Sequence, residues 1–178
     1  LKSSRLSVDI AEPGTLYCGT RFDWSAFITQ VTLDGRHTFL VPEATDGTGT
    51  GGAGLCNEFG ILNAVGYDDA RPGEPFTKPG VGLLTRPSPA CYQFDQPHAM
   101  TPYPRRVERG GDFARFITEP LEAGGYALRT TQTVSVRGNQ LVIDYLAENT
   151  GGKRIVVDEY CHNFVGINGR KTGPGLTL

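Results

Sequence analysis

The chain has 178 residues, a formal net charge of −2 and a hydrophobic content of 38%. This length is typical of one domain, and the apolar content suits a folded core rather than a disordered chain. Nucleic-acid binders usually carry a basic surface, which this charge does not provide, so we expect no nucleic-acid partner. No stretch approaches the roughly 20 apolar residues that span a bilayer, so we expect no membrane partner.

The N-terminal part is expected to form strands joined by tight turns, since the chain holds 24 Gly and 12 Pro. Residues 3–10 alternate loosely, and residues 19–33 predict a longer strand. Asp34-Gly35 then predicts a type I′ hairpin turn to a returning strand over residues 36–41. In the strand from residue 19, alternation puts Phe22, Trp24 and Ala26 on one face and Arg21, Asp23 and Ser25 on the other.

A glycine-rich loop occupies residues 46–54. It contains a G-x-G-x-x-G string at Gly47, Gly49 and Gly52, the spacing of a dinucleotide-binding turn. That turn needs a strand before it and a helix after it, and the sequence predicts neither here. We therefore expect a loop beside a binding face, and no cofactor.

The C-terminal part predicts three antiparallel strands in a row. Residues 126–136 and 140–149 alternate between apolar and polar side chains, with a short turn at residues 137–139. Residues 153–165 are expected to form the third strand of this meander. No segment has a persuasive helical period, and residues 112–119 form at most a short turn. The fold class expected is therefore an all-β antiparallel sandwich.

The expected third strand contains the candidate catalytic residue, a histidine. Alternation places Asp158, Tyr160, His162 and Phe164 on one face. Aromatic rings can stack on the apolar faces of pyranoses, and an imidazole can donate or accept a proton near neutral pH. The structural alternative is a buried histidine that bonds a backbone carbonyl.

The cysteines (Cys18, Cys56, Cys91 and Cys161) are widely scattered, without the spacing of a zinc site. We expect free and mostly buried thiols, no metal site, and a cytoplasmic location.

Several segments resemble the galactose mutarotase-like (aldose 1-epimerase-like) superfamily. Residues 160–169, Tyr-Cys-His-Asn-Phe-Val-Gly-Ile-Asn-Gly, resemble its N-H-x-Y-F-N-L-x-G signature. Residues 146–151 resemble the x-x-x-N-x-G turn that precedes it. Residues 19–25, 57–60, 66–70 and 78–82 are similar to segments of an uncharacterised bacterial subgroup, so that the resemblance covers nearly the whole chain.

The resemblance implies a single sandwich domain over residues 1–178 with a concave sugar-binding face. It also implies interconversion of sugar anomers, in which an acid and a base open and reclose the ring. His162 matches the family's acid, but the family's basic Glu near the C-terminus has no counterpart before Leu178. The domain is therefore expected to be truncated relative to the family.

Two further departures concern the motifs themselves. The family's earlier His-Gly segment corresponds here to residues 55–60, where Glu58 could serve as the substitute base or lie on a surface loop. Cys161 stands where the signature has Asn, which bears on the orientation of the His162 ring.

The remaining candidates are substrate-binding residues: Arg21, Asp23, Asn57, Lys78, Tyr160 and Asn163. Arg21 and Asp23 could bind hydroxyls by paired hydrogen bonds, or form a solvated cross-strand ion pair.

The sequence leaves two functions open: an aldose 1-epimerase that binds a carbohydrate, and a carbohydrate-binding module without catalysis or a fragment of a larger sugar-active enzyme. Open strand edges and exposed apolar surface would also favour a homodimer.

Overall fold

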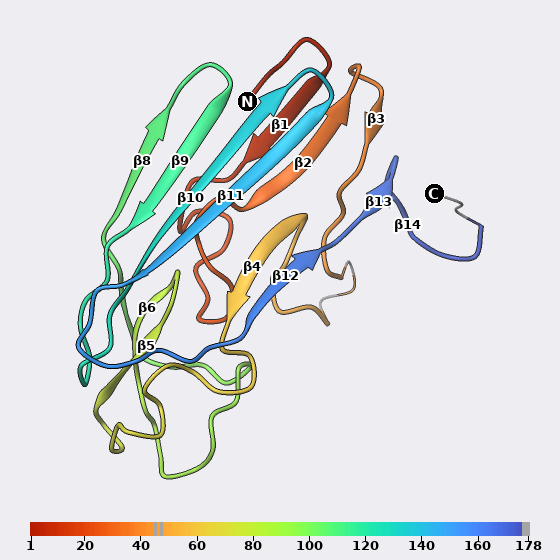
Figure 1. Cartoon of the computed structure of the whole chain (residues 1–178). Coiled ribbons are helices and arrows are strands. Elements are labelled where there is room, and N and C mark those ends of the chain that lie inside the picture. Colours follow the sequence, from red (N-terminus) through yellow and green to blue (C-terminus); the bar gives the residue numbers. More distant parts are fainter. Residues whose placement is uncertain (45, 47, 176–178) are drawn as a thin grey trace.

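The computed structural model describes residues 1–44, 46 and 48–175, and in these residues all regular structure is β. The strands (Figure 1) are β1 (Leu6–Ile10), β2 (Ile28–Leu33), β3 (His37–Thr38), β4 (Leu55–Phe59), β5 (Pro75–Lys78), β6 (Gly82–Thr85), β7 (Met100–Pro102), β8 (Arg105–Arg109), β9 (Phe113–Thr118), β10 (Leu128–Arg137), β11 (Gln140–Asn149), β12 (Glu159–Asn163), β13 (Gly166–Ile167) and β14 (Arg170–Lys171).

Two sheets pack face to face, which confirms the all-β antiparallel sandwich. The first sheet has the order β1-β2-β4-β12, with β3 paired to β2. The second has the order β11-β10-β9-β8 and crosses in front of β1 and β2 in Figure 1. Side chains from both sheets share one apolar core, with Val8 and Ile28 on one side and Phe116 and Val134 on the other.

The second sheet is a meander of consecutive antiparallel strands. Along β10 buried and half-buried residues alternate, because successive side chains point to opposite faces of a strand. β10 and β11 pair over their full lengths, and Gly138 takes a positive φ of 58° in the turn between them. The predicted strands over residues 126–136 and 140–149 and the turn at 137–139 are thus confirmed.

Two predictions for this region were wrong. Residues 113–118 form strand β9 rather than a short turn, and they pair with both β8 and β10. The expected third meander strand does not pair with β11. Instead β12 crosses to the first sheet and pairs with β4, where it covers the buried side chain of Glu58. Alternation predicts which face of a strand is buried but not which strand it pairs with.

The hairpin turn of the first sheet has the predicted conformation. Asp34 and Gly35 both have positive φ, at 52° and 64°, as a type I′ turn requires. The returning strand is shorter than predicted, since β3 spans only His37–Thr38.

The long strand predicted from residue 19 was wrong in its first half, because regular pairing begins only at Ile28. Residues 22–27 form an irregular segment in which Ala26 has a φ of 47°. A residue in this left-handed region interrupts the period of two. The segment nevertheless runs beside β4: Phe22 forms a β-bridge with Glu58, and the Asp23 amide donates to the Asn57 carbonyl at 2.8 Å.

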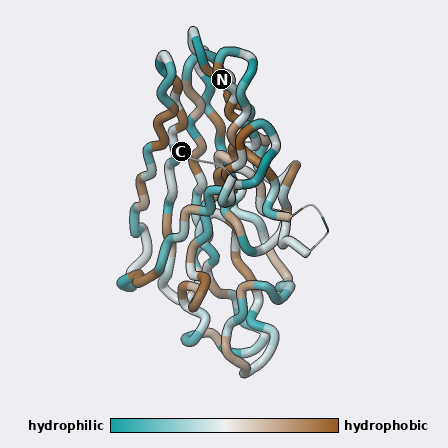
Figure 2. The backbone as a smooth tube through the Cα atoms, turned by 90° about the vertical axis from the view of Figure 1, so that its right-hand side faces the viewer, coloured by the Kyte–Doolittle hydropathy of each residue, from teal (hydrophilic) through white to brown (hydrophobic). Residues whose placement is uncertain are grey.

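A second apolar core lies under the loops around β5 and β6. It is rich in aromatic residues, including Phe22, Phe27, Tyr67 and Phe76. In Figure 2 hydrophobic segments run along the strands of the upper half, while several loop tips are hydrophilic. No helix long and apolar enough to cross a membrane occurs in the described part of the chain.

Candidate active site around His162

Strands β4 and β12 place the candidate residues side by side. Tyr160 pairs directly with Glu58, and His162 with Cys56. Directly opposed residues of an antiparallel pair point to the same face, so all four side chains lie on one face of the β4–β12 pair. The rings of Tyr160, His162 and Phe164 follow one another there, with centroid separations of 4.6 and 5.7 Å. The shared face predicted for Tyr160, His162 and Phe164 is confirmed.

Glu58 is the centre of the site, although it is completely buried. Its Oε2 accepts hydrogen bonds from His162 Nε2 and from Arg21 Nε, both at 2.9 Å. An ionised carboxylate can only accept hydrogen bonds, and the charge of Arg21 favours that form. His162 Nε2 then donates to it, and in the neutral form of the ring Nδ1 is the basic nitrogen.

Arg21 is fixed from several sides. Its guanidinium carbon lies 4.6 Å from the ring centroid of Phe22 and 4.5 Å from that of Phe94. Its Nη1 donates to Thr50 Oγ1 at 2.6 Å and lies 3.4 Å from Glu43 Oε1. Stacking and charge-assisted bonds together leave the guanidinium little rotational freedom.

A cavity of about 280 Å³ opens beside Arg21. Aromatic and polar side chains both line it: Tyr17, Thr20, Thr50, Phe94, Asp95 and Gln96. Aromatic faces with a few polar groups are the usual lining of a small-molecule site.

The glycine-rich loop borders this cavity through Thr50. Thr50 and Gly52 donate their amides to Glu43 Oε2, at 2.6 and 3.2 Å, which anchors the loop. Gly47 of the G-x-G-x-x-G string lies outside the described residues.

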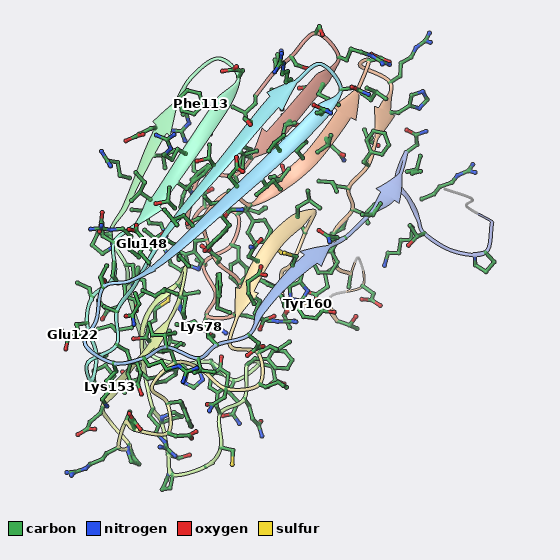
Figure 3. The ribbon with its side chains drawn as sticks, viewed as in Figure 1. Lys78, Phe113, Glu122, Glu148, Lys153 and Tyr160 are labelled. Atoms are coloured by element: carbon green, nitrogen blue, oxygen red, sulfur yellow. The ribbon has the colours of Figure 1, made fainter. Side chains whose placement is uncertain are left out.

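Lys78, the last residue of β5 (labelled in Figure 3), is completely buried. Its Nζ donates to the Tyr92 hydroxyl at 3.0 Å and lies 3.9 Å from Glu58 Oε1. Burial lowers the pKa of Lys78 to about 8, although the charge of Glu58 opposes this shift. Lys78 therefore compensates the charge of Glu58 from inside the core and does not reach a ligand, contrary to the role predicted for it.

The depressed pKa of Lys78 makes stability depend on pH. The pKa of Lys78 is about 8 in the folded chain and 10.5 in the unfolded chain. Between these two pH values the unfolded chain therefore holds the Lys78 proton and the folded chain does not. This group's contribution to stability is therefore present above pH 10.5 and is lost as the pH falls through about 8. We expect Lys78→Met to remove this dependence in urea unfolding measured across that range. The exposed Lys153, changed to Met, should leave it intact; an unchanged pH profile for Lys78→Met would contradict the assignment.

Asp23 does not join Arg21, so the prediction that the two share a face was wrong. Its carboxylate is completely buried and accepts from the Ser25 amide at 2.7 Å and the Tyr145 hydroxyl at 2.9 Å. Burial raises the pKa of Asp23. A Cβ on Gly80 would lie 2.1 Å from the Asp23 Cγ, so only glycine fits there. The irregular backbone after Phe22 turns this side chain toward the second sheet, where it has no access to a ligand.

Asn57 and Asn163 lie on the opposite face of the β4–β12 pair, away from His162. Asn57 Nδ2 donates to Glu159 Oε1 at 2.8 Å, and both asparagines line a different cavity. Asn57 is adjacent to Glu58 in β4, and Asn163 is adjacent to His162 in β12. Adjacent side chains of a strand point to opposite faces, which explains the separation.

Several residues of the site were not predicted from the sequence. Tyr92, Phe94, Glu43 and Thr50 come from loops that are distant in the chain. Thr50 belongs to the glycine-rich loop, whereas the other three belong to no periodic segment or motif, so the sequence offered no signal that would group the four.

Cys56 shares the face of His162 on the β4–β12 pair, and the other cysteines and histidines lie outside this cluster. His37 is exposed, whereas His98 is half-buried and stacks on Tyr92 with centroids 5.8 Å apart. All four cysteines are free as predicted, but only Cys56 is buried. Burial raises the pKa of its thiol to about 12. Among the described residues, no group of three or more His, Cys, Asp or Glu side chains could hold a metal ion.

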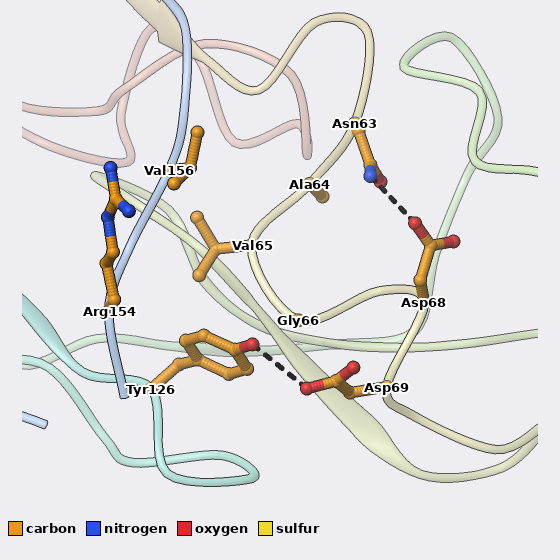
Figure 4. Close-up of a pocket in the computed structure, with 9 residues that line it drawn as sticks. All are labelled: Asn63, Ala64, Val65, Gly66, Asp68, Asp69, Tyr126, Arg154 and Val156. Atoms are coloured by element: carbon orange, nitrogen blue, oxygen red, sulfur yellow. Dashed lines mark hydrogen bonds between the residues drawn. The ribbon is translucent and has the colours of Figure 1, made fainter. Parts of the chain in front are cut away.

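A second polar cavity, of about 250 Å³, lies beyond the end of β4 (Figure 4). Tyr126 and Lys153 both donate to Asp69 Oδ2, at 2.9 and 2.8 Å, and Asn63 donates to Asp68. These polar groups are already paired with one another, so this cavity is a weaker candidate than the surface around His162.

Comparisons with known protein families, with curated proteins and with solved structures found no match.

Proposed function

We propose that this chain binds a carbohydrate on the surface around His162 and interconverts its anomers. The observation that carries the proposal is the 2.9 Å hydrogen bond between His162 Nε2 and the buried Glu58. This bond fixes the tautomer and orientation of an imidazole whose Nδ1 is then the basic atom. The row of rings beside it suits the apolar face of a pyranose. The resemblance of residues 160–169 to the mutarotase-like signature supports the same reaction.

The proposed reaction uses His162 as the acid and base. Nδ1 takes the proton of the C1 hydroxyl, the C1–O1 bond becomes a carbonyl, and the bond between C1 and the ring oxygen breaks. The ring oxygen keeps that electron pair and takes a proton from a water molecule, which in turn takes the proton held by His162 Nδ1, so that His162 acts as base first and as acid through this water. Rotation about the C1–C2 bond and the reverse steps give the other anomer. Glu58 is completely buried, so we assign it to positioning His162 rather than to the role of base in contact with the sugar.

Exchange NMR of anomer interconversion tests this proposal, using a panel of free and phosphorylated aldoses. We expect faster exchange for at least one sugar, and a loss of roughly 10²–10⁴-fold in the enzymatic rate for His162→Ala. His37→Ala is the matched control, because His37 is exposed and lies in the β2–β3 hairpin. No acceleration by the folded chain, or equal loss in both variants, would contradict catalysis.

The alternative is a carbohydrate-binding module without catalysis. It is favoured by the limited exposure of the His162 side chain, 10%, and by the cavity beside Arg21, which His162 does not line. Two variants distinguish the two functions. A binding module should keep its sugar affinity in His162→Ala and lose that affinity in Phe94→Ala. An epimerase should lose anomer exchange in His162→Ala.

A further inference from the structure

Strand β11 is an unusually open edge of the second sheet. It pairs with β10 over ten residue pairs and, within the described residues, with no strand on its other side. Natural edge strands are usually short or carry Lys or Pro, which prevents pairing with other chains. β11 has neither residue, and its large apolar side chains are exposed: Val142 by 43%, Ile143 by 39% and Leu146 by 54%.

An apolar cavity of about 360 Å³ lies along this edge. Ile143, Tyr145 and Ala147 of β11 form one wall, and β4 with β12 forms the other. The rings of Phe59 and Tyr145 meet across it with centroids 5.5 Å apart. Since β12 is itself the last strand of the first sheet, the cavity lies between two strands that each end a sheet.

The two strands that border the cavity carry acidic side chains and neither Lys nor Arg: Asp144 and Glu148 on β11, and Glu159 on β12. Arg129 of β10 lies directly across from Glu148 but is ion-paired with Glu119 at 2.9 Å. Figure 3 shows Glu148 near the end of β11. A second copy that paired through β11 would bring these acidic strands together, and like charges on neighbouring strands are destabilising.

We propose that β11 binds an extended strand of a partner protein in which apolar residues alternate with Lys or Arg. Backbone hydrogen bonds to the open edge would supply affinity, as in other β-augmentation complexes. One side of the incoming strand would place apolar side chains in the cavity beside Ile143 and Tyr145. The other side would place its basic residues next to Asp144 and Glu148. This proposal is independent of the function proposed for His162.

A peptide titration tests the proposal on the intact chain. The probes are two synthetic peptides of the same length as β11, in which Val alternates with Lys or with Glu. Fluorescence anisotropy gives the dissociation constants, and amide hydrogen exchange reports on β11. We expect the Val/Lys peptide to bind roughly tenfold or more tightly than the Val/Glu peptide and to protect β11 amides. A chain carrying both Asp144→Lys and Glu148→Lys should reverse this preference.

Variants of the apolar wall separate docking from general attraction to acidic surface. Ile143→Lys should abolish binding, whereas Leu62→Lys, at an apolar residue 83% exposed and outside the cavity, should not. Binding without protection of β11 would overturn the proposal, and so would a preference that survives the charge reversal. A dimer detected by analytical ultracentrifugation, with β11 amides protected, would overturn it in favour of a second copy.

Discussion

Replacement of Glu58 by alanine is expected to destabilise the chain by about 3–5 kcal/mol, as when one partner of a buried ion pair is removed. Glu58 is completely buried and accepts from Arg21 and His162, with Lys78 Nζ 3.9 Å away. Without the carboxylate, Arg21 loses its Nε partner and Lys78 loses the nearest opposite charge inside the core. Such a loss is a large part of the stability of a typical domain. Urea unfolding at neutral pH measures it directly.

Glu58→Gln is the informative partner variant. Glutamine keeps the shape and one acceptor oxygen but not the charge, so it should be less destabilising than alanine. It should also reduce anomer exchange without removing sugar binding, because His162 loses the carboxylate that orients it. An alanine variant as stable as the parent chain would show that the cluster does not depend on Glu58.

Phe22→Ala is expected to be nearly as destabilising, at about 3–5 kcal/mol, because it leaves a cavity in a packed aromatic core. Phe22 is completely buried, and its ring lies 5.2 Å from Tyr17 and 6.3 Å from Phe27 between centroids. The same ring lies edge-on to His162 at 5.1 Å and against the Arg21 guanidinium. The variant should therefore lose both stability and the alignment of the site.

Thermal and urea unfolding, with NMR of the His162 ring, distinguish these two effects. Leu62→Ala is the control, since Leu62 is 83% exposed and its truncation should change stability by less than about 0.5 kcal/mol. A Phe22→Ala chain with the parent's stability would contradict the packing described for this core.

The candidate site was predicted in part. Alternation in residues 158–164 placed His162 among aromatic rings, and Glu58 was a candidate for the substitute base, with a surface-loop residue as the alternative. Their contact was not deducible, because it depends on β12 pairing with β4 across about a hundred residues of chain. The predicted role of Asp23 failed for a local reason, since residues 22–27 form no regular strand and the period of two does not hold between Arg21 and Asp23.

The sequence by itself determined the all-β class, the β10–β11 hairpin, the Asp34-Gly35 turn and the face on which His162 lies. Each depends on interactions between near neighbours: side-chain alternation and turn residues with positive φ. Only the tertiary structure decided that β12 joins the first sheet and that Glu58 contacts Arg21, Lys78 and His162. It also decided that β11 has no strand on its outer side among the residues that the structure describes. Backbone hydrogen bonds are the same for every strand, so partner choice depends on which pairing buries the apolar faces and compensates the buried charges.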